Sequence, residues 1–178
     1  PARLPDRVSQ LFLIGAYAAG WPHLAGPAEV EQREAVITLA RAGWGQDNPV
    51  YRQIFSQTFM PSATKEELDW FNDFRRRTAS PANAVRFLEA FATIDVRHRL
   101  AEVKCPTLVI HARGDQRVPL AQGIQLASAI PGASLVTLDT DSHIPLSREP
   151  ATDRIIDCIN AFLRTASVAY PLHRRRIA

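Results

Sequence analysis

Three short apolar runs along the chain predict the strands of a buried β-sheet. The first covers residues 8–14, is almost continuous in hydrophobic side chains and ends at a glycine. The other two cover residues 107–112 and 134–138 and are rich in β-branched and aliphatic side chains. Such runs are typical of parallel strands that are covered on both faces, so they favour a parallel sheet.

Residues 27–93 carry helix signals and no convincing strand pattern. Thr64 and Glu67 have the spacing of a capping box, in which the two side chains bond to each other's backbone amides. Ser80 precedes a proline, which is typical of a helix start, and apolar side chains follow it at helical spacing. We predict about four helices in this segment, inserted between the first and second strands.

Helical patterns also follow the second and third strands. Leu120, Ile124 and Ala127 repeat at helical spacing between them, and Ile155, Ile159 and other apolar residues do so after the third strand. Alternation of strand and helix predicts right-handed crossovers and a parallel sheet with helices on its faces. The predicted fold class is therefore α/β, with a helical insertion over about 21–95.

Composition and charge exclude several classes of protein. Hydrophobic residues make up 46% and charged residues 22% of the 178, which excludes a disordered chain, and no apolar run reaches the length of a membrane span. The net charge of +3 comes from Arg174–Arg176, so residues 1–173 are neutral overall and no basic groove for nucleic acid is expected. Cys105 and Cys158 lack metal-site spacing and predict a reducing, cytoplasmic compartment, with no metal or cofactor.

Two residues with catalytic chemistry follow the predicted strands. Asp115 follows the strand at 107–112, and His143 follows the strand at 134–138. Reactive groups collect at the carboxyl ends of parallel strands, and a histidine that acts as general base needs a carboxylate on one ring nitrogen. Asp115 also fits a turn-forming aspartate and His143 a plain loop histidine. Asp139 and Asp141 are alternative acids, but on the same loop they are less able to reach the far ring nitrogen.

Several motifs together resemble the α/β-hydrolase family. They are VKCPTLVIHARGDQRVP at 103–119, IPGA at 130–133, DSH at 141–143 and PDRVSQL at 5–11. The resemblance implies that Asp115 and His143 are the acid and base of a catalytic triad. Ser142 departs from the family pattern, in which a glycine often precedes the histidine.

Three shorter motifs narrow the resemblance. GWGQDNP at 43–49, ASPANA at 79–84 and IDV at 94–96 resemble the cap of a bacterial subgroup that is often joined to a DNA-binding or nucleotide-cyclase domain. The resemblance implies a sheet strand at 1–20 and a helical cap at 21–95. It also implies a C-terminal α/β part at 96–165 that carries the acid and histidine, and a basic tail at 166–178.

The nucleophile of the triad has no counterpart in the sequence. A nucleophile elbow needs Gly-x-Ser-x-Gly, and none of the eight glycines lies in such a motif. By the resemblance, residues 1–4 correspond to the end of the nucleophile helix, so the elbow is expected upstream of residue 1. We therefore expect the C-terminal half of a hydrolase sheet, an exposed sheet edge near 8–14, and a missing N-terminal half as the partner of this edge.

Two functional hypotheses follow. The first is a serine-dependent hydrolase of a small ester or related carbonyl substrate, in which an upstream serine attacks and His143 transfers the proton. An upstream aspartate would instead indicate dehalogenase or epoxide-hydrolase chemistry. The second hypothesis is a non-catalytic, ligand-sensing module of a regulatory or signalling protein.

Other residues have structural interpretations. His111 lies on a predicted strand and is expected to be a hydrogen-bonded structural histidine. The helix-ending arginines 75–77 are expected on a solvated face. Core packing is the expected role of the aromatic residues of the insertion, with the lining of an acyl pocket as the alternative; these residues are Trp21, Trp44, Phe59 and Trp70.

The absence of an elbow generates a first prediction. Purified residues 1–178 are expected to show no ester hydrolysis, because no activated serine faces His143. A chromogenic ester assay on the purified chain checks this expectation. Ester cleavage that is abolished by His143→Ala would contradict it.

Overall fold

The protein's computed structural model describes residues 1–169 except for positions 25, 45, 47 and 48. The arginines predicted to form a basic tail, and three positions of the 43–49 motif, lie outside the described residues. No helix in the described part of the chain is both long and apolar enough to cross a membrane.

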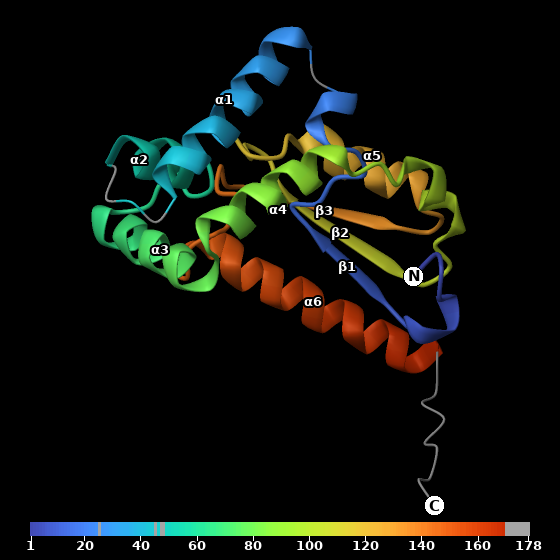
Figure 1. The fold of residues 1–178 in the computed structure, drawn as a ribbon. Helices are drawn as coiled ribbons and strands as arrows, with labels where there is room; N and C mark the ends of the chain where they lie inside the picture. The colour runs from blue at the N-terminus through green and yellow to red at the C-terminus, as the bar shows by residue number, and fades with distance from the viewer. Residues whose placement is uncertain (25, 45, 47–48, 170–178) are drawn as a thin grey trace, which may run out of the picture.

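A three-stranded parallel sheet lies at the centre of the molecule (Figure 1). Its strands are β1 (Leu11–Ile14), β2 (Thr107–Ala112) and β3 (Ser134–Leu138), with β2 in the middle. Every residue of β2 is buried, as expected for a parallel strand that is paired on both sides. The predicted α/β class and the predicted strands at 107–112 and 134–138 are therefore confirmed.

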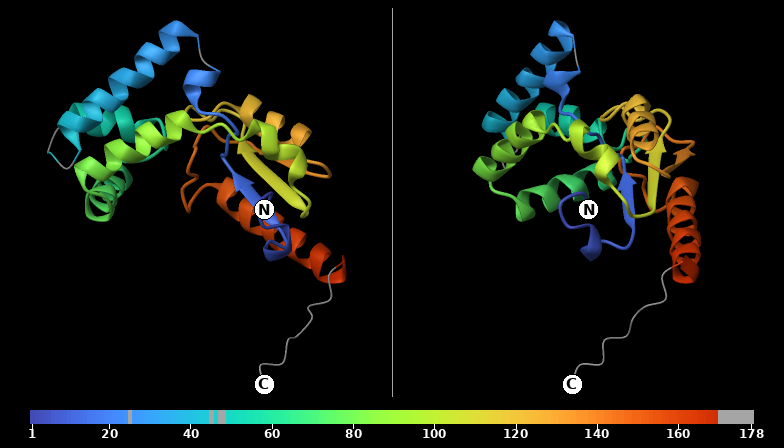
Figure 2. Two further views of the ribbon diagram at one scale, coloured as in Figure 1. Left: turned by 45° about the vertical axis from the view of Figure 1, so that its right-hand side comes forward. Right: turned by 90° about the vertical axis from the view of Figure 1, so that its right-hand side faces the viewer.

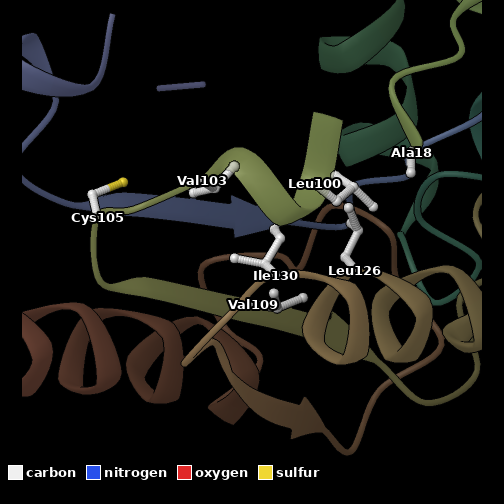
Figure 3. Close-up of a cluster of buried hydrophobic side chains, with 7 residues drawn as sticks. All are labelled: Ala18, Leu100, Val103, Cys105, Val109, Leu126 and Ile130. Atoms are coloured by element: carbon white, nitrogen blue, oxygen red, sulfur yellow. The ribbon is translucent and has the colours of Figure 1, made fainter. Parts of the chain in front are cut away.

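Helices cover both faces of the sheet (Figures 1 and 2). On one face α6 (Pro150–Ala169) packs on the sheet, where Phe12 meets Phe162 edge to face at 5.2 Å. On the other face α5 (Leu120–Ala129) and the 3₁₀ helix η3 (Arg97–Glu102) enclose a second core. Figure 3 shows this core, which contains Ala18, Leu100, Val103, Cys105, Val109, Leu126 and Ile130.

The first strand is shorter than the apolar pattern predicts. The run at 8–14 predicts one buried strand, but β1 begins only at Leu11, after a short 3₁₀ helix η1 (Pro5–Arg7). β1 pairs with β2 alone in the described sheet, and its residues are half-buried or exposed. A strand with one neighbour is an edge strand, so full burial of this run is wrong and the expected open edge is observed in the described sheet.

Four α-helices lie between β1 and η3. Helices α1 and α4 pack on each other, and α2 packs on both α1 and α3 around a largely aromatic core that includes Trp44, Tyr51 and Phe55. Figure 2 shows them as a group set apart from the sheet. Their bounds are α1 Pro27–Gly43, α2 Pro49–Gln57, α3 Lys65–Thr78 and α4 Pro81–Thr93, preceded by the 3₁₀ helix η2 Trp21–His23.

The predicted helix starts in this segment are confirmed. At the start of α3, the Thr64 hydroxyl accepts from the Glu67 amide at 3.3 Å, and the Glu67 carboxylate accepts from the Thr64 amide at 2.8 Å. At the start of α4, the Ser80 hydroxyl accepts from the Asn83 amide at 3.3 Å. These bonds satisfy amides that have no partner within the first helical turn.

The two segments that enter and leave this helical group run side by side. An antiparallel bridge joins Ala19 to Asp95, and the Gly20 amide donates to the Ile94 carbonyl at 2.7 Å. A Cβ atom at position 20 would lie 2.1 Å from the Ala92 carbonyl oxygen. Only glycine therefore permits the close approach of these two segments, which we call the neck of the insertion.

The neck generates a stability prediction. Gly20→Ala is expected to lower the free energy of unfolding by about 1–3 kcal/mol, because the added methyl group overlaps backbone atoms that cannot yield. Urea denaturation monitored by circular dichroism measures the change. Gly26→Ala is the matched control, since a Cβ at position 26 meets no atom within 4 Å. Equal stability of the Gly20→Ala variant and the wild type would show that the neck is loose.

Candidate active site

Asp115 and His143 form a hydrogen-bonded pair at the carboxyl ends of β2 and β3. His143 Nδ1 and Asp115 Oδ2 are 2.7 Å apart. The Asp115 side chain is 1% exposed and that of His143 is 19% exposed. The two residues singled out from the sequence are therefore brought together, with the carboxylate in the interior and the imidazole at a surface that ligands can reach.

The second oxygen of Asp115 holds its own turn. Asp115 Oδ1 accepts hydrogen bonds from the backbone amides of Arg117 and Val118, each at 2.8 Å. Burial raises the pKa of Asp115, but the hydrogen bonds from His143 and from these two amides outweigh burial and hold that pKa below its ordinary value. Asp115 is thus both the turn-forming aspartate and the partner of the histidine, two roles that the sequence leaves as alternatives.

The other two acids considered from the sequence stay apart from the imidazole. Asp139 and Asp141 are exposed. Asp141 packs instead against Gly114 in the Asp115 turn. The approach is so close that a Cβ added at Gly114 would lie 1.7 Å from Asp141 Oδ1. The pairing of β2 with β3 sets the distance between Asp115 and His143. This arrangement favours Asp115 over Asp139 and Asp141 as the acid partner of the histidine.

Glu149 organises the loop that carries His143. Its carboxylate accepts from the Thr140 hydroxyl at 2.6 Å, the Ser142 hydroxyl at 2.9 Å and the Leu146 amide at 3.2 Å. Ser142, the departure from the family pattern, is 1% exposed and belongs to this network. Burial raises the pKa of Glu149, but its hydrogen bonds outweigh burial and lower it. Glu149 is a positioning residue that the sequence analysis missed. It lies six positions after His143 and forms no recognisable motif with that residue.

His111 lies beneath the pair as a buried structural histidine. Its Nε2 donates to the Val118 carbonyl at 2.8 Å and lies 3.7 Å from Asp115 Oδ2. Its Nδ1 has no hydrogen-bond partner among the described residues and packs against Gly123 of α5. The predicted structural role is confirmed for one ring nitrogen, which braces the turn that Asp115 also holds.

A cavity of about 880 Å³ opens beside His143. It lies between the strand ends and the inserted helices, and its volume falls within the range of small-molecule sites. Phe59 contacts the imidazole edge to face at 5.5 Å. Gly15, at the end of β1, has a φ of +56° and lies against the same imidazole. The aromatic part of the lining comprises Tyr17, Trp21, Trp44, Phe55, Phe59, Phe71, Phe87 and Phe91.

The structure corrects one prediction on an aromatic residue. Trp70 is 66% exposed and stacks on Phe74 at 5.6 Å, so it is not a core residue. Trp44 is buried in the core of the insertion, whereas Trp21 and Phe59 are only half-buried; all three line the cavity. The pattern of α3 places Trp70 on a face that has no packing partner among the described residues.

Arg75 also differs from its predicted role. It was expected on a solvated face, but only 9% of the residue is exposed. Its guanidinium lies over the rings of Trp44 at 4.9 Å and Phe55 at 4.5 Å, and it donates to Ser56 and Asn72. Cation–π contacts and these hydrogen bonds replace the solvent that burial removes, although burial still lowers the pKa of Arg75.

No described group of three His, Cys, Asp or Glu side chains has the geometry to hold a metal ion. Acid–base chemistry by the Asp115–His143 pair at the cavity wall is what the described arrangement supports. The imidazole has one nitrogen engaged by a buried carboxylate and the other available for a proton from a ligand or nucleophile.

The sequence is similar to a known family and to several known proteins. Residues 1–150 match the family model described as "alpha/beta hydrolase fold". The chain is 25% identical over 169 residues to a putative carbamate hydrolase RutD of Rhizobium rhizogenes, covering 93% of this chain and 61% of that protein. It is also 25% identical over 169 residues to the pimeloyl-[acyl-carrier protein] methyl ester esterase of Nitrosomonas europaea, covering 88% of this chain and 62% of that protein.

Solved structures show the same fold. The enol-lactonase from Burkholderia xenovorans LB400 superposes with a TM-score of 0.72 at 25% identity, covering 92% of this chain and 59% of that one. A hydrolase from Oleispira antarctica has a TM-score of 0.70 at 18% identity, covering 92% of this chain and 59% of that one. The chain therefore spans about three fifths of these relatives, and its structure is a partial version of their fold.

The Glu149 network generates a prediction on stability and pH. Glu149→Gln is expected to lower the free energy of unfolding by about 1–2 kcal/mol at pH 7, because an amide accepts fewer of these hydrogen bonds. A lowered carboxyl pKa stabilises the fold above the ordinary carboxyl range, and this stabilisation is lost as the pH falls through the folded-state value. The difference from the wild type should therefore shrink in acid.

Urea titrations at pH 7 and at several acidic values measure this difference. Asp139→Asn, an exposed carboxylate beside the same loop, serves as the matched control. A stability difference that is the same at every pH would show that the Glu149 charge plays no part.

Proposed function

The chain belongs to the alpha/beta hydrolase family, and on that premise we propose that it carries the acid and base of a hydrolase that cleaves a small ester or related carbonyl substrate. The observation that carries the proposal is the 2.7 Å contact between His143 Nδ1 and the buried Asp115 carboxylate at the wall of the cavity. A carboxylate in this position fixes the imidazole tautomer and stabilises the imidazolium that forms during proton transfer.

In the proposed mechanism, His143 acts first as a general base and then as a general acid. Its Nε2 takes the proton of a serine hydroxyl as the oxygen attacks the substrate carbonyl carbon, and a tetrahedral intermediate forms. The same nitrogen then donates the proton to the leaving oxygen as the acyl bond breaks. Water repeats the sequence on the acyl-enzyme, releases the acid and restores the serine.

The serine of this proposal comes from a segment that precedes these residues in the whole protein. Neither a Gly-x-Ser-x-Gly motif in the sequence nor a serine, threonine or cysteine in the described cavity lining supplies a nucleophile here. The relatives are longer than this chain, of which they match nearly all. The open edge of β1 is the place where further strands of the sheet would pair.

A small acyl compound is the proposed substrate class. The names of the relatives specify a carbamate, a methyl ester and an enol lactone, which all contain an acyl carbonyl bonded to oxygen or nitrogen. The cavity volume and its aromatic lining suit a ligand of this size. Cys105 and Cys158 are free thiols, which supports the proposed cytoplasmic location.

The proposed mechanism predicts a large loss of activity when the pair is broken. In the full-length protein, His143→Ala is expected to lower kcat on a reactive ester by about 10³- to 10⁴-fold, and Asp115→Asn by a similar factor. KM should change far less, because neither residue provides most of the binding surface. Steady-state kinetics over a panel of short-chain esters measures both constants.

Asp139→Asn is the matched control and should retain wild-type kinetics, because this carboxylate is exposed and makes no bond to the imidazole. Activity that survives His143→Ala would refute the assignment of the base. A full-length protein that binds small acyl compounds without turnover would instead support the ligand-sensing alternative.

A further inference from the structure

Arg117 is a cation in the cavity wall that no described carboxylate neutralises. Its guanidinium lies over the rings of Phe59 at 4.9 Å and Phe55 at 5.4 Å. Its side chain makes no hydrogen bond or ion pair with any described residue. Asp115 is the nearest acid in sequence, but its two oxygens are occupied by His143 and by backbone amides.

The backbone holds Arg117 in place on both sides. Its amide donates to Asp115 Oδ1 at 2.8 Å, and its carbonyl accepts from the Arg33 guanidinium at 3.3 Å. The turn that orients the acid of the pair therefore also positions Arg117. These bonds fix the backbone of Arg117, and the rings of Phe55 and Phe59 contact its guanidinium.

The other two arginines of the lining, Arg33 and Arg75, differ from Arg117 in their hydrogen bonds. Arg33 pairs with Glu29 at 3.3 Å, and Arg75 donates to Ser56 and Asn72. Three cations and one anion thus line the cavity, so Arg75 and Arg117 both lack a carboxylate partner. Arg75 is buried, whereas Arg117 is half-buried and shares the Phe59 ring with His143. A mostly apolar cavity with an accessible guanidinium that no carboxylate neutralises favours an anionic ligand.

The pKa of Arg117 also favours an anionic ligand. Burial, together with the positive charge of Arg33, lowers the pKa of Arg117 to about 10. The group is still charged at neutral pH, but the protein solvates this charge poorly. An anion beside it would supply the missing stabilisation.

Arg117 and His143 contact the same phenyl ring. Phe59 meets the imidazole on one side at 5.5 Å and the guanidinium at 4.9 Å. A short ligand can therefore reach both groups, with its reactive carbonyl near the histidine and its charged end at the arginine. A planar carboxylate matches the guanidinium fork best, because two parallel N–H groups can donate to its two oxygens.

We propose that the cavity selects acyl substrates that carry a free carboxylate, and that Arg117 binds this carboxylate while His143 acts at the acyl carbonyl. The inference rests on the proposed hydrolase function and names its substrate class. The aromatic walls accommodate the aliphatic part of the ligand, and Arg117 sets its direction. Neutral esters of the same length fit the same space but leave the guanidinium without a partner.

The test compares two esters with the same carbon chain, one ending in a carboxylate and the other in the methyl ester of that carboxylate. Monomethyl glutarate carries a free carboxylate, whereas dimethyl glutarate carries none. In the full-length protein, kcat/KM is expected to be at least about 10-fold higher for the charged ester. In Arg117→Met it is expected to fall by about 10- to 100-fold for the charged ester and by less than about 3-fold for the neutral one.

Two further variants separate charge from structure. Arg117→Lys should recover part of the preference, because it restores the charge without the planar fork. Arg113→Met removes an exposed arginine from the same strand end and should keep the wild-type preference. Equal loss on both esters in Arg117→Met would mean that Arg117 has only a structural role and would overturn the proposal.

Binding of glutarate keeps this inference distinct from the proposed activity. Calorimetric titration with glutarate should show binding to the wild type and to His143→Ala, and at least 10-fold weaker binding to Arg117→Met. A protein that hydrolyses neither ester but binds glutarate through Arg117 would refute the hydrolase function and retain the anion site. A wild type that neither binds glutarate nor prefers the charged ester would overturn the anion site itself.

Discussion

The register between β2 and β3 is the constraint on which the site depends. Ala112 lies opposite Leu138, so the chain leaves both strands at the same level and the two following loops meet. Asp115 and His143 come from these loops, and their 2.7 Å contact exists only in this register. A shift by one residue would reverse the face of every side chain on β3, so the core beneath the sheet also maintains the geometry of the pair.

Much of this arrangement could be predicted from the sequence because it depends on local or strongly periodic signals. The runs of β2 and β3 are continuous in apolar and β-branched side chains and therefore stand out, although only β2 is buried along its whole length. The capping box at Thr64 depends on residues three positions apart. The choice of Asp115 over Asp139 and Asp141 follows from the short reach of an acid on the same loop as the histidine and from the family motif. In the structure, Asp115 and His143 form a contact that spans 28 positions.

The features that the sequence analysis missed or predicted wrongly depend on long-range packing. Arg75 looks like a solvated helix-end cation until α2 is placed beside α3 and covers it with aromatic rings. Trp70 looks like a core residue, but the opposite side of the same helix is the one that meets a partner. The first strand lacks the three predicted residues before Leu11, because its partner β2 begins at Thr107, which pairs with Leu11. Glu149 and Arg117 have no local signature, since their roles arise from the groups that surround them.

The neck between Ala18–Gly20 and Ile94–Val96 has a consequence for how this protein can diversify. The inserted helices begin and end at one point, so their lengths can change without altering the spacing of the strands. Two places in the described insertion also contact the strand ends. Arg33 of α1 donates to the Arg117 carbonyl, and the stretch 59–67 contacts the histidine loop through the Phe59 carbonyl and through the ion pair of Glu67 with Arg148. Evolution can therefore reshape α4, and with it the choice of ligand, while these contacts keep the loops at the strand ends in place.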